Sequence, residues 1–187
     1  PFLLRRTKAE VLTELPPRTE MTIEVELSAE ERELYDVARL AAMDRLDRAA
    51  GLAESDRRMH ALAALTELRQ LAGHPRRVYP DLQAESSKMR VFLERVEELR
   101  DGGHRALVFS QFTRHLDLVW RELDARGVRY QYLDGSTPTQ RRQEQVDAFQ
   151  RGDAELFLIS LKAGGTGLNL TAADYVIHLD PWWNPAV

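Results

Sequence analysis

Residues 156–170 read LFLISLKAGGTGLNL, and this stretch decides the fold of the chain. The uninterrupted apolar run at 156–159 is typical of a strand that is buried on both faces. Three glycines follow within four positions, at Gly164, Gly165 and Gly167. Glycine accepts positive φ angles and lets ligand atoms approach the backbone. A buried strand that runs into a glycine-lined turn therefore predicts an α/β sheet with a ligand-binding turn at its edge.

The flanking sequence repeats this pattern of strand and helix. Apolar runs predict further strands at 106–109, 128–133 and 175–179, and an apolar stripe predicts a helix over 112–123. Thr137 is expected to cap another helix, with Pro138 as its first residue and with Val146 and Phe149 facing inward. Apolar strands that alternate with helices imply a parallel sheet with helices on both faces.

The first hundred residues follow a different periodicity. Residues 22–27 alternate polar and apolar side chains, which predicts a half-buried strand. Ser28 and Glu31 form a capping box that opens a helix. Leucines at helical spacing predict a second helix over 56–72, and Ser87 is expected to cap a third helix that ends near residue 101. We therefore expect an extended segment (1–27), a helical subdomain (28–101) and a sheet lobe (102–187).

Composition excludes several classes of protein. The 187 residues contain no cysteine, which removes disulfides and thiolate metal sites, and no apolar run is long enough to cross a membrane. The net charge of −4 means that any nucleic-acid contact must come from a local cluster. The sequence has no Gly-Lys dipeptide and hence no phosphate loop of the P-loop type, and no Asp-Glu dipeptide for a magnesium motif. The missing initial Met indicates a piece of a longer chain, and the 23 arginines against three lysines indicate a GC-rich, bacterial genome.

Four loops are expected to carry the chemistry, because ligands bind at the carboxyl ends of parallel strands. The loop after residue 159 offers the Ser160 hydroxyl, the Lys162 charge and backbone amides that can form an anion-binding nest. The alternative is a turn that needs glycine for its shape only. The loop at Ser110 and Gln111 suits phosphate oxygens, although Ser110 could equally cap a helix.

The remaining two loops also allow two interpretations each. Ser136 and Arg141, beside a helix N-terminus, would form a phosphate-binding patch, or they belong to an ordinary turn and a solvated helix face. The last loop contains Trp182 and Trp183 between two prolines. A tryptophan here could stack on or wedge into nucleic acid, or pack against a neighbouring part of the protein.

Several of these stretches resemble motifs of Swi/Snf-family helicase-like ATPases. Residues 107–112 (LVFSQF) resemble motif IV, residues 132–137 (YLDGST) the element after it, and residues 158–185 motif V with its extension. Residues 1–8, 15–17 and 68–75 (LRQLAGHP) are similar to the inter-lobe segment and the helical insertion. The resemblance runs nearly end to end and identifies the chain as a C-terminal RecA-like lobe that stops before motif VI. Residues 1–27 would be the inter-lobe connector, and the lobe at 102–187 would be incomplete.

The resemblance implies the second motor lobe of an ATP-dependent double-stranded DNA translocase or remodelling ATPase. In that family two RecA-like lobes clamp ATP and Mg²⁺, which the absent first lobe would bind mainly, and both grip the DNA backbone without sequence specificity. No catalytic residue is expected in this chain, because the paired arginines of motif VI would lie beyond Val187, so the chain alone should hydrolyse no ATP. The ATP cleft would receive Gly165, Gly167 and Asn169. DNA contacts would come from Ser110, Gln111, Ser136, Arg141, Ser160, Lys162 and Trp183, with Ala163 between cleft and strand.

The resemblance also bears on partners and rival functions. The expected partners are duplex DNA, the N-terminal RecA-like lobe of the same protein and, for a bacterial protein without nucleosomes, RNA polymerase or other DNA-bound proteins. The expected location is the cytoplasm, at the nucleoid, with no membrane contact. The alternatives are a lobe of a strand-separating helicase, or a non-catalytic α/β module that binds a nucleotide or a partner. The tryptophan extension and the helical insertion favour the Swi/Snf type.

Overall fold

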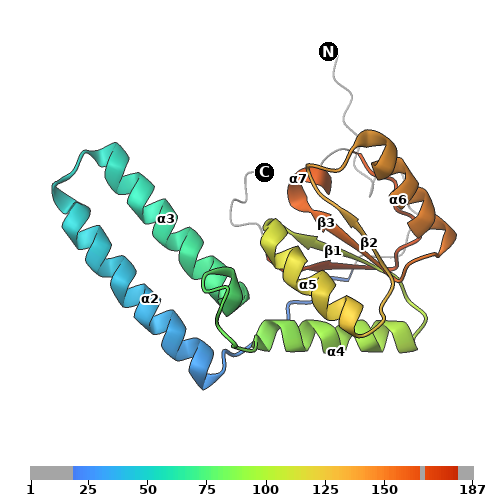
Figure 1. Ribbon diagram of the computed structural model, residues 1–187, viewed down its shortest axis with the longest axis horizontal. Helices are drawn as coiled ribbons and strands as arrows, with labels where there is room; N and C mark the ends of the chain where they lie inside the picture. The colour runs from blue at the N-terminus through green and yellow to red at the C-terminus, as the bar shows by residue number, and fades with distance from the viewer. Residues whose placement is uncertain (1–18, 165–166, 181–187) are drawn as a thin grey trace, which may run out of the picture.

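Four parallel strands form the centre of the molecule. The computed structural model describes residues 19–164 and 167–180 (Figure 1). The strand order is β2-β3-β1-β4, and all three neighbouring pairs are parallel. The strands are β1 (Ala106–Ser110), β2 (Tyr130–Leu133), β3 (Leu156–Ser160) and β4 (Tyr175–His178). This arrangement confirms the predicted RecA-like α/β fold.

Helices cover both faces of this sheet, because its central strands are apolar on both sides. From here on, the sheet lobe means the four strands together with four helices. These are α4 (Ser87–Asp101), α5 (Thr113–Ala125), α6 (Thr139–Arg151) and the short α7 (Leu161–Gly164). On one face, Val96 of α4 and Val119 of α5 pack with Leu158 of β3. On the other face, Phe149 of α6 packs on Phe157 of β3, with ring centroids 5.4 Å apart. The inward orientation predicted for Phe149 is confirmed.

A pair of helices extends away from the sheet (Figure 1). We call α2 (Ala29–Arg48) and α3 (Glu54–Gly73) the helical hairpin; the 3₁₀ turn η1 (Ala49–Gly51) joins them, and η2 (Pro75–Arg77) follows α3. The capping box predicted at Ser28 and Glu31 is present. Leu71 is buried, but Leu62 and Leu65 are 49% and 59% exposed, because no helix or strand of the described residues covers their side of α3. Among the described residues, neither apolar core includes a residue of the hairpin.

Three local predictions are wrong, two of them because a neighbouring group takes the expected partner. Residues 22–27 form no strand, since no strand of the described sheet pairs with them. The N-cap of α4 is Ser86, whose Oγ accepts a 3.3 Å hydrogen bond from the Met89 amide, while Ser87 is held by Glu31. Thr137 does not cap α6, because its hydroxyl accepts a 3.1 Å hydrogen bond from the Asp134 amide and Pro138 takes the N-cap position.

The helix α4 packs in the same apolar core as the sheet, so it is part of the structural unit formed by the strands. The predicted division into three segments, with a boundary after residue 101, stays a prediction. Within the described residues no helix is long and apolar enough to span a membrane.

Candidate functional site

The candidate site is the edge of the sheet at which all four strands end. Parallel pairing places Ser110, the last residue of β1, directly beside Ser160, the last residue of β3. β2 flanks β3, and β4 flanks β1. The four loops that the sequence singled out therefore leave the same edge, as expected for a parallel sheet.

The turn after β3 is open to the surface. Lys162, Gly167 and Asn169 are exposed. Gly167 has a φ of 69°, which a residue with a side chain rarely adopts, and nothing lies within 4 Å of the place where its Cβ would be. Gly164 is needed for space instead, since a Cβ there would lie 2.9 Å from the Phe109 ring. Gly165 lies outside the described residues.

Two side chains of α6 hold the two ends of this turn. The Arg142 Nη1 donates a 3.2 Å hydrogen bond to the Ala163 carbonyl. The Gln150 Nε2 donates to the Asn169 carbonyl at 3.1 Å, and the Gln150 Oε1 accepts from the Ala172 amide at 2.9 Å. The backbone on both sides of the glycines is thus fixed to one helix, while the Lys162 side chain points to solvent.

Asp134 organises the loop after β2. Its Oδ1 accepts hydrogen bonds from the Ser136 amide at 2.9 Å and from the Ser136 hydroxyl at 2.7 Å. Burial would raise the pKa of Asp134, but hydrogen bonds from Ser136 and Thr137 lower it below its usual range. Ser136 and the nearby Arg141 are both exposed, beside the N-terminus of α6. A phosphate at this helix N-terminus would meet amide donors and the Arg141 charge.

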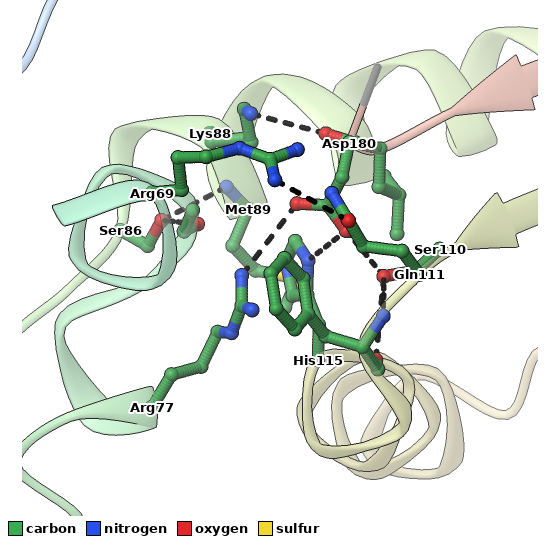
Figure 2. Close-up of polar contacts among 12 residues, drawn as sticks. Arg69, Arg77, Ser86, Lys88, Met89, Ser110, Gln111, His115 and Asp180 are labelled. Carbon is green, nitrogen blue, oxygen red and sulfur yellow. Dashed lines mark hydrogen bonds and ion pairs between the residues drawn. The ribbon is translucent and has the colours of Figure 1, made fainter. Parts of the chain in front are cut away.

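A buried polar network occupies the other half of the edge (Figure 2). We call Arg77, Lys88, Ser110, His115 and Asp180 the Asp180 cluster. Asp180, only 5% exposed, accepts a short hydrogen bond from the Ser110 hydroxyl and lies 3.4 Å from the His115 Nδ1. Burial would raise the pKa of Asp180, but hydrogen bonds from His115 and Ser110 and the charge of Arg77 lower it to about 2. Burial lowers the pKa of His115, so a neutral His115 donates from Nδ1 to a charged Asp180.

Two cations complete the cluster. The Arg77 Nη1 lies 3.5 Å from the Asp180 Oδ1, and its guanidinium carbon lies 3.9 Å from the centre of the Phe112 ring. Burial lowers the pKa of Arg77 to about 10, although the Asp180 charge opposes this shift. The Lys88 Nζ donates a 3.0 Å hydrogen bond to the Leu179 carbonyl. The cluster therefore joins η2, α4, α5 and the ends of β1 and β4.

The predicted site residues fall into three groups. Ser136, Arg141, Lys162, Gly167 and Asn169 are exposed at the edge. Ser110 and Ser160 are buried, so a contact between Ser110 and a phosphate would require the Asp180 cluster to open. Gln111 is half-buried, and its Oε1 accepts a 3.4 Å hydrogen bond from Arg69. Trp183 lies outside the described residues.

Sequence reasoning missed Arg77, His115 and Asp180 as one unit. Asp180 directly precedes the loop that contains the two tryptophans, and Arg77 lies two residues after the 68–75 stretch. The available signal was a charged residue, Asp180, directly after an apolar strand, and this signal does not identify the partner.

The fold and this edge define a helicase C-terminal lobe. The helicase conserved C-terminal domain family matches residues 87–187, and the SNF2-related domain family matches residues 1–77. The chain belongs to the Swi/Snf family of helicase-like ATPases and represents its C-terminal RecA-like lobe.

Similar proteins come from all three domains of life. YwqA of Bacillus subtilis is 39% identical over the whole chain, and the human SWI/SNF-related matrix-associated actin-dependent regulator of chromatin subfamily A member 1 is 36% identical over the whole chain. The chain spans about a fifth of the length of these curated relatives, 21% and 19% respectively. The Sulfolobus solfataricus SWI2/SNF2 ATPase core in complex with dsDNA is 28% identical with a TM-score of 0.79, covering 98% of this chain and 40% of that one. This range of organisms leaves the bacterial source a prediction.

Proposed function

We propose that this chain is the second motor lobe of an ATP-dependent double-stranded DNA translocase, and that it contributes one side of the ATP cleft and contacts to the DNA backbone. The observation that carries this proposal is the open turn after β3. It exposes Lys162 and Gly167 at the edge of the sheet, while α6 holds its two ends. One short segment can thus face a nucleotide on one side and a phosphate chain on the other. Membership of the Swi/Snf family, and a similar ATPase core in complex with dsDNA, support this reading.

The proposed DNA contacts are those that the edge exposes. Ser136, Arg141 and Lys162 offer a hydroxyl and two positive charges near the N-terminus of α6. These groups suit phosphate oxygens, which carry no sequence information directly. Because the net charge is −4, attraction to DNA depends on this local patch, and binding should weaken as salt rises.

The proposed nucleotide contacts involve backbone more than side chains. The space beside Gly167 lets the phosphates or ribose of ATP approach the backbone, and Asn169 is exposed next to it. Mg²⁺ would be bound mainly by the first lobe, as in the family that the sequence resembles. Within the described residues no group of three or more His, Asp and Glu side chains could hold a metal ion. Bound ATP would supply the free energy of hydrolysis. The isolated chain is expected to hydrolyse no ATP even with DNA added, and an ATPase assay checks this.

The test compares two arginines at opposite ends of α6 in the full-length ATPase. Arg141→Ala should weaken binding to a duplex oligonucleotide and lower the salt dependence of binding by about one unit of slope, because one phosphate contact is lost. Arg151→Ala is the matched control, since Arg151 is exposed at the other end of α6 and pairs with Asp153. Lys162→Ala should also lower DNA-stimulated ATP hydrolysis.

The outcomes separate the proposal from its rivals. Equal binding and salt slopes for the two arginine variants, together with normal activity of Lys162→Ala, would remove the proposed interface. Separation of DNA strands by the full-length protein would instead assign it to the strand-separating helicases. Tight nucleotide binding by this chain alone would favour a simple binding module.

A further inference from the structure

The helical hairpin is attached to the sheet lobe through polar contacts. Neither apolar core contains a residue of α2 or α3 within the described residues. Two buried carboxylates, Glu31 and Asp180, lie at the junction instead, and each is 5% exposed or less. The orientation of the hairpin therefore depends on hydrogen bonds and an ion pair, which are directional, more than on apolar packing.

The first junction is local to the helix ends. The Glu31 carboxylate accepts hydrogen bonds from the Ser28 amide at 2.9 Å and from the Ser87 amide at 3.0 Å. A single carboxylate thus caps both α2 and α4. Its hydrogen-bond partners are residues at helix starts, and none of them belongs to a loop of the candidate site.

The second junction connects the hairpin to the candidate site. Arg77 comes from η2 at the base of the hairpin, and Asp180 lies two residues after the end of β4 (Figure 2). Gly73, the last residue of α3, makes room for this pair: a Cβ there would lie 2.4 Å from the Arg77 Nη1. Asp180 in turn accepts a hydrogen bond from Ser110 at the end of β1. A shift of the hairpin base therefore acts directly on the ends of two strands.

The energetics argue against a role in stability alone. Burying an ion pair costs about as much as the pair returns, and apolar replacements are often as stable. Among the described residues, the buried Arg77 nitrogens have no hydrogen-bond partner; the Asp180 Oδ1 lies 3.5 Å from Nη1, and the guanidinium carbon lies 3.9 Å from the centre of the Phe112 ring. Such a contact holds the base of the hairpin in one orientation relative to the strand ends. Because neither residue belongs to an apolar core, the contact can change without disrupting the packing of the lobe.

We propose that the Arg77–Asp180 pair is a positioning contact that transmits movement between the strand ends and the helical hairpin, and so sets how far DNA moves for each ATP hydrolysed. This inference rests on the proposed translocase function. Neither residue needs to touch ATP or DNA, and both act through Ser110 and the neighbouring loops.

The experiment uses the full-length ATPase with Arg77→Met, Asp180→Asn and the double variant. Displacement of a triplex-forming oligonucleotide reports DNA movement, and it is divided by the ATP consumed in the same reaction. We expect this ratio to fall about tenfold in all three variants, within the range for residues that couple two sites, while DNA-stimulated hydrolysis persists. Thermal stability should fall in the single variants, which bury an unpaired group, and recover in the double variant. A purely structural role would restore the ratio as well.

Glu31→Gln is the matched control, because it alters the other buried carboxylate of the junction. Its ratio should stay close to that of the unmodified enzyme. A normal ratio in the double variant, or an equal loss in Glu31→Gln, overturns the coupling role. Parallel loss of hydrolysis and displacement in folded variants overturns it too, since the pair would then act on hydrolysis. If the unmodified enzyme displaces no oligonucleotide, the proposed function itself fails.

Discussion

The sheet lobe and the helical hairpin are stabilised in different ways. In the lobe, residues such as Phe149, Phe157 and Leu158 are fully buried between helices and strands. In the hairpin, Val37, Leu40 and Leu65 are each about 60% exposed, and the attachment to the lobe is polar. Apolar packing thus fixes the edge of the sheet that carries the candidate site, whereas charges and hydrogen bonds set the direction of the hairpin. The lobe should therefore tolerate changes of charge better than changes of volume, and the junction should do the opposite.

The largest expected effect is the loss of a large side chain from the lobe. Phe149→Ala should lower the free energy of unfolding by about 3–5 kcal/mol, because it removes a ring from a closed core. Leu65→Ala, on the exposed face of α3, should change it by less than about 0.5 kcal/mol. Urea unfolding measures both. Equal losses would mean that the exposed face of the hairpin is covered in solution, and the contrast between the regions would disappear.

A smaller effect should come from pH, and it should arise at the junction. Burial, with further lowering by the charge of Arg76, lowers the pKa of His74 to about 4, and its Nδ1 accepts a 3.2 Å hydrogen bond from the Arg76 amide. The unfolded chain takes up a proton below pH 6.5 that folded His74 excludes. Stability should therefore fall as the pH drops from about 6.5 to about 4, by about 3 kcal/mol for this group.

Other buried groups can be separated from this effect. The pKa of His115 is also lowered by burial, so His115 adds to the same trend. The pKa of Asp180 is lowered from 3.8 to about 2, so the charged Asp180 stabilises the fold above pH 3.8. This contribution is lost only as the pH falls from 3.8 towards 2. His74→Asn keeps an acceptor for the Arg76 amide and should reduce the slope between pH 6.5 and 4. An unchanged slope in His74→Asn would place the titration elsewhere.

The smallest expected effect compares one glycine from each region. Gly167→Ala should cost about 1 kcal/mol, because its φ of 69° is unfavourable for a residue with a Cβ. Gly51→Ala, in the turn that joins α2 and α3, meets no atom within 4 Å and has no positive φ, so its cost should be close to zero. Thermal unfolding of the two variants gives the difference. The same loss at both positions would show that the turn after β3 needs no special backbone geometry.

The two regions also differ in how well the sequence predicts them. All four strands were predicted, because a parallel sheet buried on both faces leaves continuous apolar runs such as residues 156–159. The alternation at 22–27 misled, since a strand also needs a neighbour to pair with. The Asp180 cluster could not be predicted: its members are far apart in the sequence, and buried charges have no periodicity. Ser110 lies at the end of β1, where its hydroxyl donates a hydrogen bond to Asp180, and its contact with a phosphate stays a prediction.

The two hydrogen-bonded anchors on α6 have one more consequence. Arg142 and Gln150 are eight positions apart on a helix that rises about 1.5 Å per residue, so their backbone positions are separated by about 12 Å. The two hydrogen bonds therefore tie the chain at Ala163 and at Asn169 to separate points on one helix. Each bond limits how far the backbone at its own end can move away from α6, so the two ends of the turn are positioned by a helix outside the turn.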